Sequence, residues 1–128
     1  MYRMFLQKNK MKIKLTLKSL PPLVNATYKS GGGRFYKSNA SKIAQDALRW
    51  EIKGKYRGRP LTGLLGANLG FWWGDKRRRD IDSGIKATLD ACTGILWEDD
   101  SQIIELFVTK GFDKKNSRTE IEVYSLTK

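Results

Sequence analysis

The amino-acid sequence of 128 residues contains no histidine. Without imidazole side chains, a serine-hydrolase triad, an HExxH zinc site and a histidine-dependent nuclease site are all excluded. Carboxylate oxygens remain, and they suit hard ions such as Mg²⁺ or Mn²⁺, which can activate water without an imidazole. Any metal chemistry in this protein is therefore expected to use oxygen ligands.

Cysteine and long apolar runs are also scarce. The single cysteine, Cys92, cannot form an intramolecular disulfide, which excludes a secreted scaffold built on paired cysteines and favours a reducing cytosolic setting. The uncharged stretch 61–74 is interrupted by four glycines and an asparagine, whereas a membrane-spanning helix needs about 20 mostly apolar residues. Residues 1–14 lack the apolar run of a signal peptide. We therefore expect neither membrane association nor export.

Acidic residues are few and unevenly placed. The 25 Lys and Arg residues oppose 13 Asp and Glu residues, and the resulting net charge of +12 favours polyanionic partners such as nucleic acid or anionic lipid. Seven of the acids fall within residues 80–105 beside a single lysine, so this segment carries −6 and the remainder +18. Such crowding favours a bound divalent cation. The alternative is that these acids cover a solvated helix and loop.

The length predicts one domain, and the apolar pattern predicts the α+β class, with a small mixed sheet of about four strands and two main helices. The expected elements are strands at 12–17, 65–73, 103–109 and 119–124, and helices at 40–52 and from about 82 to 94. Their order is strand, helix, strand, helix, strand, strand. The last two strands, joined by the turn-rich segment 110–118, are expected to pair antiparallel.

Two local features refine this expectation. In the first helix, Ile43, Ala47 and Leu48 are expected to form one apolar face. The glycine triplet 31–33 lacks the Lys-Ser/Thr of a P-loop and is interpreted as a flexible turn.

The segment Arg77-Arg78-Arg79-Asp80-Ile81-Asp82 is the clearest candidate site. If the strand at 65–73 continues through it, Asp80 and Asp82 project from one face and can share a metal ion, because side chains alternate along a strand. A metal or the flanking arginines would offset the repulsion between the two carboxylates. Alternatively, Asp82 caps the following helix and Asp80 pairs with the arginines. The two interpretations can coexist.

Two further residues join this candidate site. Asp100, in the acidic group 98–100, would complete a three-carboxylate cage if the following strand lies beside the one ending at Asp80; otherwise the group is an exposed polar turn. Lys86 lies four residues from both Asp82 and Asp90. Its role is either an i, i+4 ion pair or the neutralisation of charge that develops on a phosphate during cleavage.

Basic residues beside the acids predict a phosphodiester substrate. Guanidinium groups would hold flanking phosphates while a metal acts on the scissile one, although basic runs are also common on solvated faces. Most tryptophans are expected in the core, whereas Phe35 and Tyr36 are the best candidates for stacking on unpaired bases. The predicted DNA-binding residues are Lys76, Arg77, Arg78, Arg79, Arg34 and Lys37.

The ordered set from Asp75 to Glu105 resembles the RusA family of Holliday-junction resolvases, small endonucleases of phages and prophages. The residues that carry the resemblance are Arg77-Arg78-Arg79-Asp80-x-Asp82, Lys86, Asp90-Ala91, Gly94, Trp97 and Asp99-Asp100. A weaker match covers the front of the chain, from Pro21-Pro22 through Asn25 and Tyr28, and begins near Met11. Family members often have Asn where this chain has Ser83, which affects a secondary hydrogen bond rather than the metal ligands.

The resemblance implies a homodimer that binds four-way DNA junctions and nicks two strands symmetrically with Mg²⁺, for which Mn²⁺ could substitute. Asp80, Asp82 and Asp100 would be the metal ligands, and Lys86 would act beside them. It also implies a single nuclease domain at 11–128, with 1–10 either an extension or upstream of the true start, and a cytoplasmic location in a bacterial or phage-infected cell. The uncharged strand 65–73 is the expected dimer surface. The alternative function is a non-catalytic basic DNA-binding protein of a phage or mobile element.

Overall fold

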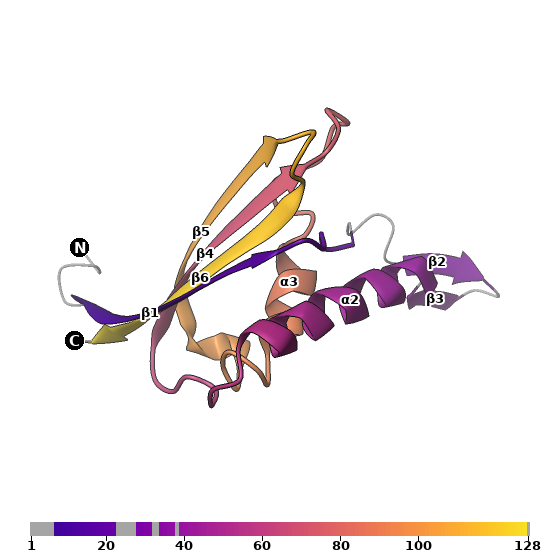
Figure 1. The fold of residues 1–128 in the computed structure, drawn as a ribbon. Coiled ribbons are helices and arrows are strands. Elements are labelled where there is room, and N and C mark those ends of the chain that lie inside the picture. The colour runs from indigo at the N-terminus through magenta and orange to yellow at the C-terminus, as the bar shows by residue number, and fades with distance from the viewer. Residues whose placement is uncertain (1–6, 23–27, 32–33, 38, 128) are drawn as a thin grey trace.

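The computed structural model describes residues 7–22, 28–31, 34–37 and 39–127, and side chains within 12–22 and 39–126 (Figure 1). The strands are β1 (Gln7–Leu17), β2 (Tyr28–Gly31), β3 (Arg34–Lys37), β4 (Leu65–Trp73), β5 (Ile103–Phe112) and β6 (Arg118–Thr127). The helices are α2 (Asn39–Lys55), α3 (Ile85–Cys92) and the 3₁₀ helix η2 (Asp100–Gln102). Apart from the β2–β3 hairpin, the order is the predicted one, and the α+β class is confirmed.

Four strands form a mixed sheet in the order β1-β6-β4-β5, and both long helices pack on one face of it (Figure 1). β6 pairs antiparallel with β1 and with β4, whereas β4 and β5 are parallel. The helical residues in the core are Leu48 and Ile52 from α2 and Ala91 and Cys92 from α3. Leu65, Leu69 and Phe71 of β4 pack against them and are at most 2% exposed. Alternate strand residues therefore line the core and the open face of the sheet.

The predicted antiparallel pairing of the last two strands is wrong, because β4 lies between β5 and β6. α3 carries the chain from the end of β4 back to the start of β5, and such a crossover makes the two strands parallel. The connection from β5 to β6 then passes over the end of β4, where the Asp113 amide donates to the Trp73 carbonyl at 2.8 Å. A turn-rich connector alone did not reveal this crossing.

The structure corrects two smaller expectations. β4 ends at Trp73 instead of continuing through 76–79. The expected turn at the glycine triplet is not tested, because Gly31 is the last residue of β2 and Gly32 and Gly33 lie outside the described residues. Ile43 and Ala47 are exposed while Leu48 is buried, because successive helical residues are rotated by about 100° and Leu48 lies about 140° from Ile43.

The expected dimer surface at 65–73 is also not available in this fold. β4 is a central strand, paired on both edges, and its apolar side chains Leu65, Leu69 and Phe71 belong to the core. Its uncharged character thus reflects burial within one chain. In the described part of the chain, no helix is both long and apolar enough to cross a membrane.

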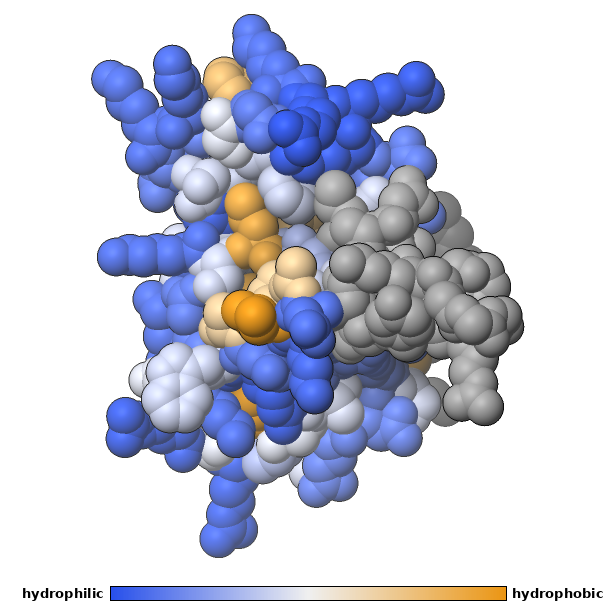
Figure 2. Space-filling model, turned by 90° about the vertical axis from the view of Figure 1, so that its right-hand side faces the viewer, coloured by the Kyte–Doolittle hydropathy of each residue, from blue (hydrophilic) through white to orange (hydrophobic). Residues whose placement is uncertain are grey.

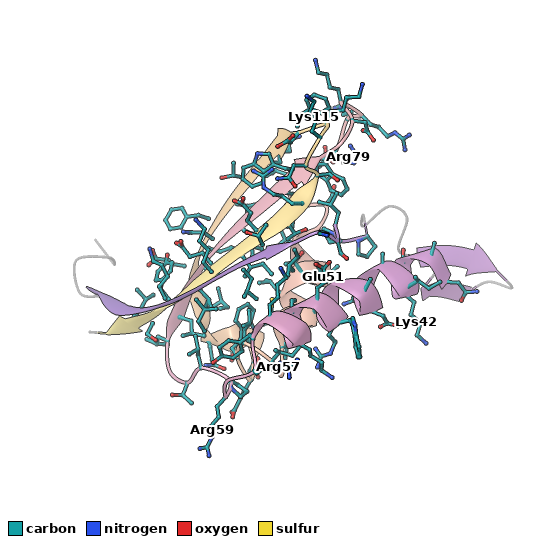
Figure 3. The ribbon with its side chains drawn as sticks, in the orientation of Figure 1. Lys42, Glu51, Arg57, Arg59, Arg79 and Lys115 are labelled. Carbon is teal, nitrogen blue, oxygen red and sulfur yellow. The ribbon has the colours of Figure 1, made fainter. Side chains whose placement is uncertain are left out.

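Two polar side chains of α2 fix its position against its neighbours. The Glu51 carboxylate accepts the amides of Lys18 and Ser19 at 2.8 and 2.7 Å, just after β1 (Figure 3). Burial raises the pKa of Glu51, but hydrogen bonds to Ser19 and Lys18 outweigh that effect and lower it. Arg49 donates to the carbonyls of Ala91 and Thr93 at 3.2 and 2.8 Å, at the C-terminal end of α3. The arginine therefore satisfies carbonyls that the helix leaves unpaired.

Replacement of Arg49 should destabilise the protein. Arg49→Met removes two charge-assisted hydrogen bonds from the end of α3, and we expect the free energy of unfolding to fall by roughly 1.5–3 kcal/mol. Urea denaturation measures this loss. The matched control is Arg59→Met, an exposed arginine whose replacement should change stability by less than about 0.5 kcal/mol. Equal losses in both variants would contradict the assigned role of Arg49.

Candidate functional site

The acidic pair Asp80 and Asp82 lies in a turn that leads into α3. The chain bends at Gly74, is irregular through residue 80, and turns at 81–84. The Ser83 amide donates to the Asp80 carbonyl at 3.1 Å, and the Ile85 amide donates to the Asp82 carbonyl at 3.3 Å. The predicted extended conformation is therefore wrong, because the backbone is already winding toward the helix. Both carboxylates are exposed.

The alternative roles weighed for these two acids are also not observed. The N-cap residue of α3 is Gly84, which has no side chain to cap the helix, so Asp82 does not fill that position. The carboxylate that pairs with the arginine run is Asp75, not Asp80. Within the described residues, Asp80 and Asp82 are thus left facing solvent at the N-terminal end of α3, where the helix dipole favours negative charge.

Asp75, Arg79 and Trp73 form a brace that holds this loop against the sheet. The Arg79 guanidinium donates to both oxygens of Asp75, at 2.8 and 3.2 Å, and its Cζ lies 4.1 Å from the centroid of the Trp73 ring. Lys110 of β5 donates to the Arg79 carbonyl. The side chain of Arg79 is only 9% exposed. Of the four predicted DNA-binding residues in this loop, Arg79 is therefore the one whose side chain stabilises the conformation of the loop.

The brace lowers the pKa of Asp75 to about 2, from an ordinary value of 3.8. Hydrogen bonds from the Arg79 side chain are the main cause, followed by the bond from the Arg77 amide. Asp75 is thus ionised throughout the neutral range, and its charge is matched by Arg79.

The remaining basic residues of the loop are exposed. Lys76, Arg77 and Arg78 lie in the loop itself, and the Lys76 ammonium lies 5.3 Å from the Phe112 ring centroid. This end of the molecule is strongly hydrophilic (Figure 2). A cavity of about 310 Å³ lies here, lined by Trp73, Asp75, Lys76, Arg77, Arg79, Lys110, Gly111 and Phe112. Cations and aromatic rings together suit the phosphates and bases of a nucleic acid.

The other two predicted DNA-binding residues, Arg34 and Lys37, are the first and last residues of β3. The structure places their backbone in the β2–β3 hairpin, where Arg34 pairs with Gly31 and Lys37 with Tyr28. Their side chains lie outside the described residues. Their role in DNA binding remains a prediction.

Lys86 lies in the first turn of α3, with its side chain 81% exposed. Its ammonium is 3.7 Å from the Asp90 carboxylate, which is the i, i+4 ion pair considered in the sequence. Asp82 precedes the helix, so only Lys86 and Asp90 lie together on one side of it. A surface pair of this kind is weak, about 0.3–0.5 kcal/mol, so the lysine can leave it to meet a phosphate.

Asp100 lies at the other end of α3 from Asp80 and Asp82. One of its carboxylate oxygens, Oδ1, accepts the Thr93 hydroxyl at 2.5 Å and the Trp97 indole N–H at 2.8 Å. Thr93 is the C-cap residue of α3, and Trp97 is fully buried. Burial of the neighbouring Cys92, and then the charge of Asp100, raise the pKa of the thiol. This part of the chain is tightly packed.

The parallel sheet explains why the three acids are divided. β5 does lie beside β4, as predicted, but Leu65 at the start of β4 pairs with Ile103 at the start of β5. Asp80 follows the end of β4 and Asp100 precedes the start of β5, so the crossover helix separates them. Among the described residues, no three His, Cys, Asp or Glu side chains lie together as metal ligands would. The oxygen donors of Asp80 and Asp82 suit Mg²⁺, but one chain does not form the three-carboxylate cage.

Two other parts of the structure had little signal in the sequence. Asp99 and Gln102 form a reciprocal capping box at η2, and the Gln102 amide also donates to the carbonyls of Leu61 and Gly63 at 2.9 and 3.0 Å. These bonds anchor the segment beside Asp100 to the start of β4. The spacing Asp-x-x-Gln is the signature that could have predicted the box.

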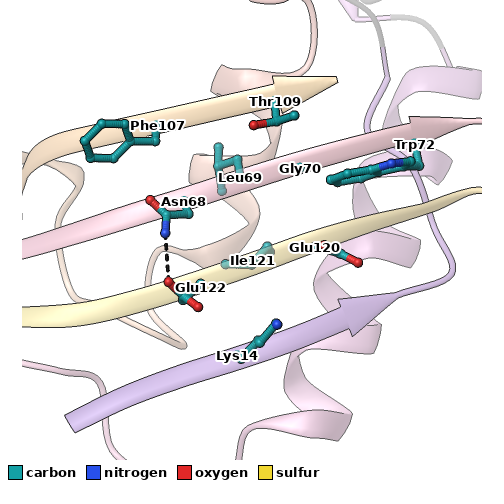
Figure 4. A pocket seen from close by; sticks show the side chains of 10 residues that line it. All are labelled: Lys14, Asn68, Leu69, Gly70, Trp72, Phe107, Thr109, Glu120, Ile121 and Glu122. Atoms are coloured by element: carbon teal, nitrogen blue, oxygen red, sulfur yellow. Dashed lines mark hydrogen bonds between the residues drawn. The ribbon is translucent and has the colours of Figure 1, made fainter. Parts of the chain in front are cut away.

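A larger cavity, of about 480 Å³, lies on the open face of the sheet (Figure 4). Its lining residues are Lys14, Asn68, Leu69, Gly70, Trp72, Phe107, Thr109, Glu120, Ile121 and Glu122. The Asn68 amide donates to Glu122 across it at 2.7 Å. It contains none of the residues predicted to act on DNA, and its two glutamates would repel phosphates.

Comparison with known proteins identifies the family. A family model described as endodeoxyribonuclease RusA matches residues 19–124. The chain is 31% identical over 104 residues to the crossover junction endodeoxyribonuclease rusA of Enterobacteria phage 82, with 80% of this chain and 87% of the relative covered. It is 30% identical, with the same coverage, to the crossover junction endodeoxyribonucleases RusA of Escherichia coli (strain K12) and Shigella sonnei (strain Ss046). The chain therefore belongs to the RusA family of endodeoxyribonucleases.

The pKa of Asp75 predicts a pH dependence. A carboxyl whose pKa is depressed by folding stabilises the fold above its unfolded pKa and loses that contribution as the pH falls through the folded value. Wild-type stability should therefore drop between about pH 4 and pH 2 by more than that of Asp75→Asn, measured by urea denaturation across that range. Raising the ionic strength should narrow the difference, because the pair is exposed. Identical pH profiles of the two proteins would count against the brace.

Proposed function

We propose that this protein is a Mg²⁺-dependent endodeoxyribonuclease that resolves four-way DNA junctions by paired symmetric nicks. Its family and its relatives are crossover junction endodeoxyribonucleases. The observation that carries the chemical assignment is the loop after β4, where the exposed acids Asp80 and Asp82 stand directly beside the exposed bases Lys76, Arg77 and Arg78. Membership in a nuclease family favours the enzyme over the alternative of a non-catalytic DNA-binding protein.

DNA binding starts from the net charge of +12, which attracts the phosphate backbone over a long range. Lys76, Arg77 and Arg78 then hold the phosphates next to the scissile bond, while Arg79 keeps the loop in place through Asp75. Arg34 and Lys37 extend this binding surface along the β2–β3 hairpin. Because the acids lie within the same loop as the bases, the phosphates that the bases hold are brought next to the carboxylates.

In the proposed cleavage reaction, the two acids of the turn bind the metal ion. Asp80 and Asp82 are the oxygen ligands of one turn, and Mg²⁺ commonly completes its coordination with water and substrate phosphate. When bound, Mg²⁺ supplies Lewis-acid polarisation of the phosphate and lowers the pKa of water. Lys86, released from Asp90, neutralises the charge that develops on the phosphate oxygens. The products are a 5′-phosphate and a 3′-hydroxyl.

Asp100 is the third acid in the proposed cleavage reaction. The proposal also requires two identical copies of the chain. Asp100 lies beyond α3 from the other two acids, so its part in cleavage is separable from theirs by mutation. A four-way junction has two-fold symmetry, and two equivalent cuts call for a symmetric pair of active sites. We therefore expect a homodimer acting on chromosomal or phage DNA in the cytoplasm.

Loss of either acid in the turn should stop cleavage without weakening DNA binding. We expect Asp80→Asn and Asp82→Asn each to lower the rate of junction nicking by roughly a hundredfold or more, because several kcal/mol of metal-dependent stabilisation are lost. Binding should persist or tighten, since a negative charge facing phosphates is removed. A labelled junction with and without Mg²⁺ measures nicking, and a gel-shift assay measures binding. The control is Glu98→Gln, an exposed acid outside the loop; retained nicking in both aspartate variants would reject the site.

Two substitutions of Asp100 separate chemistry from packing. Asp100→Asn keeps an oxygen that can accept from Thr93 and Trp97, so the thermal midpoint should stay nearly constant while nicking falls. Asp100→Ala leaves both donors without that acceptor, so it should also lower the free energy of unfolding by about 1–3 kcal/mol. Both quantities are measured on the same preparations. Full nicking by Asp100→Asn would remove Asp100 from the active site and leave it a structural role.

A further inference from the structure

The smaller cavity, at the end of the sheet, brings two aromatic rings and several cations together. Its volume of about 310 Å³ lies at the lower end of the range for small-ligand pockets, roughly 300–1,000 Å³. Trp73 of β4 and Phe112 of β5 are register partners, and both line the cavity. Phe112 ends β5 and is 44% exposed, so its ring belongs to the wall of the cavity rather than to the hydrophobic core.

This cavity lies on the side of the sheet that faces the helices. Side chains alternate along a strand, so Lys110 and Phe112 project from the same face of β5 as Val108, which packs against the core. Lys110 donates to the carbonyl of Arg79, the residue directly before Asp80. The cavity therefore lies beside the backbone that leads into the acidic turn.

The two rings differ in how firmly their cations are held. The Arg79 guanidinium, 4.1 Å from the centroid of the Trp73 ring, is fixed by its two hydrogen bonds to Asp75. The Lys76 ammonium lies 5.3 Å from the Phe112 centroid on an exposed side chain, and a cation–π contact at an exposed site is weak. A planar ligand can therefore displace Lys76 from Phe112, whereas Arg79 keeps its place on Trp73.

Basic residues flank Phe112 on two sides. Three exposed bases lie in the loop after β4, at 76–78, and the exposed Lys114 and Lys115 follow Phe112 in the connection from β5 to β6. Figure 3 shows Arg79 and Lys115 at the same end of the sheet. A DNA strand whose phosphates contact both basic groups brings the nucleotide between them to Phe112.

The lining of the cavity suits a nucleobase better than a phosphate. An aromatic ring stacks on the face of any base, whereas it offers a phosphate no hydrogen bond. Lysine and arginine N–H groups donate to the ring nitrogens and carbonyl oxygens at base edges. The Asp75 carboxylate is already engaged by Arg79. The polar side chains left to contact a base are therefore the donors Lys76, Arg77 and Lys110.

We propose that this cavity binds an unstacked nucleobase of the DNA strand next to the scissile phosphate, and that Phe112 is the residue on which the base stacks. Strands part at the branch point of a junction, where taking a base out of the stack costs less than it does inside a duplex. The inference rests on the proposed function for the position of the scissile phosphate. It makes Phe112 a specificity-determining residue, because the cavity contacts a base where the loop contacts phosphates.

The first experiment measures binding in EDTA, without any cleavage. An abasic nucleotide replaces each nucleotide around the branch point of a four-way junction in turn, and a gel-shift assay measures the dissociation constant. Wild type should lose roughly tenfold in affinity at the nucleotide whose base enters the cavity. Phe112→Leu should bind the intact junction about tenfold more weakly and show no further loss at that abasic position, because the stacking partner is already missing.

Two further variants separate stacking from packing. Phe112→Tyr keeps an aromatic face and should retain the wild-type affinity and the abasic penalty. The matched control is Phe107→Leu, the same exchange on the same strand at a ring that is 50% exposed and lines the other cavity. It should leave both quantities unchanged. The thermal midpoints of all three variants should stay close to that of wild type, since neither ring belongs to the hydrophobic core.

The second experiment measures the sequence preference of nicking with Mg²⁺. Four junctions carry A, C, G or T at the nucleotide identified by the abasic scan. The ratio of the fastest to the slowest nicking rate should fall at least fivefold in Phe112→Leu, because a base that is not stacked is no longer held against the donors of the cavity. Phe107→Leu should keep the wild-type ratio.

An abasic penalty of equal size in wild type and Phe112→Leu would overturn the inference, as would a ratio of nicking rates that Phe112→Leu leaves unchanged. A uniform loss of affinity in Phe112→Leu for junction and duplex alike would also overturn it, because it would reduce Phe112 to a non-specific contact. The proposed function fails separately. A Phe112-dependent abasic penalty without any nicking in Mg²⁺ would reject the nuclease assignment alone, and nicking that does not depend on Phe112 would reject the base site alone.

Discussion

The parallel pairing of β4 with β5 decides which residues of this protein can meet. Because α3 must carry the chain from one end of β4 to the opposite end of β5, segments that follow β4 and segments that precede β5 are held at opposite ends of the sheet. The loop with Asp80 and Asp82 lies at one end, and Asp100 lies at the other beside Thr93 and Trp97. β6 pairs with the other edge of β4, which makes β4 an interior strand of the sheet.

Three of the four basic residues in the loop remain exposed at the candidate site, because the fourth, Arg79, holds the loop in place. Arg79 is held between Asp75 and Trp73, and this arrangement keeps the loop in a fixed shape while its neighbours remain exposed. A basic loop without such a support would repel itself and lose its conformation. The order Asp75, Arg79, Asp80 therefore combines a structural pair with an exposed acid, the proposed metal ligand, over six residues.

The sequence predicted the class of fold and the family, and it failed where long-range geometry decides. Alternation at Leu65, Leu69 and Phe71 was enough to predict β4, and the motif around Asp80 was enough to suggest a nuclease. Local patterns could not predict that β5 runs parallel to β4, since strand pairing depends on the path of α3. Nor could they distinguish Leu48 from Ile43, because both are apolar and only tertiary packing selects the buried side of α2.

Cys92 gives the protein a built-in reporter of local opening. The thiol is fully buried at the end of α3, and its pKa is raised, so the reactive thiolate is disfavoured in the folded state. An alkylating reagent should therefore modify it only when the surrounding segment opens. Because Cys92 is the sole cysteine of the chain, its rate of alkylation measures the local opening of that segment directly, without any engineered probe.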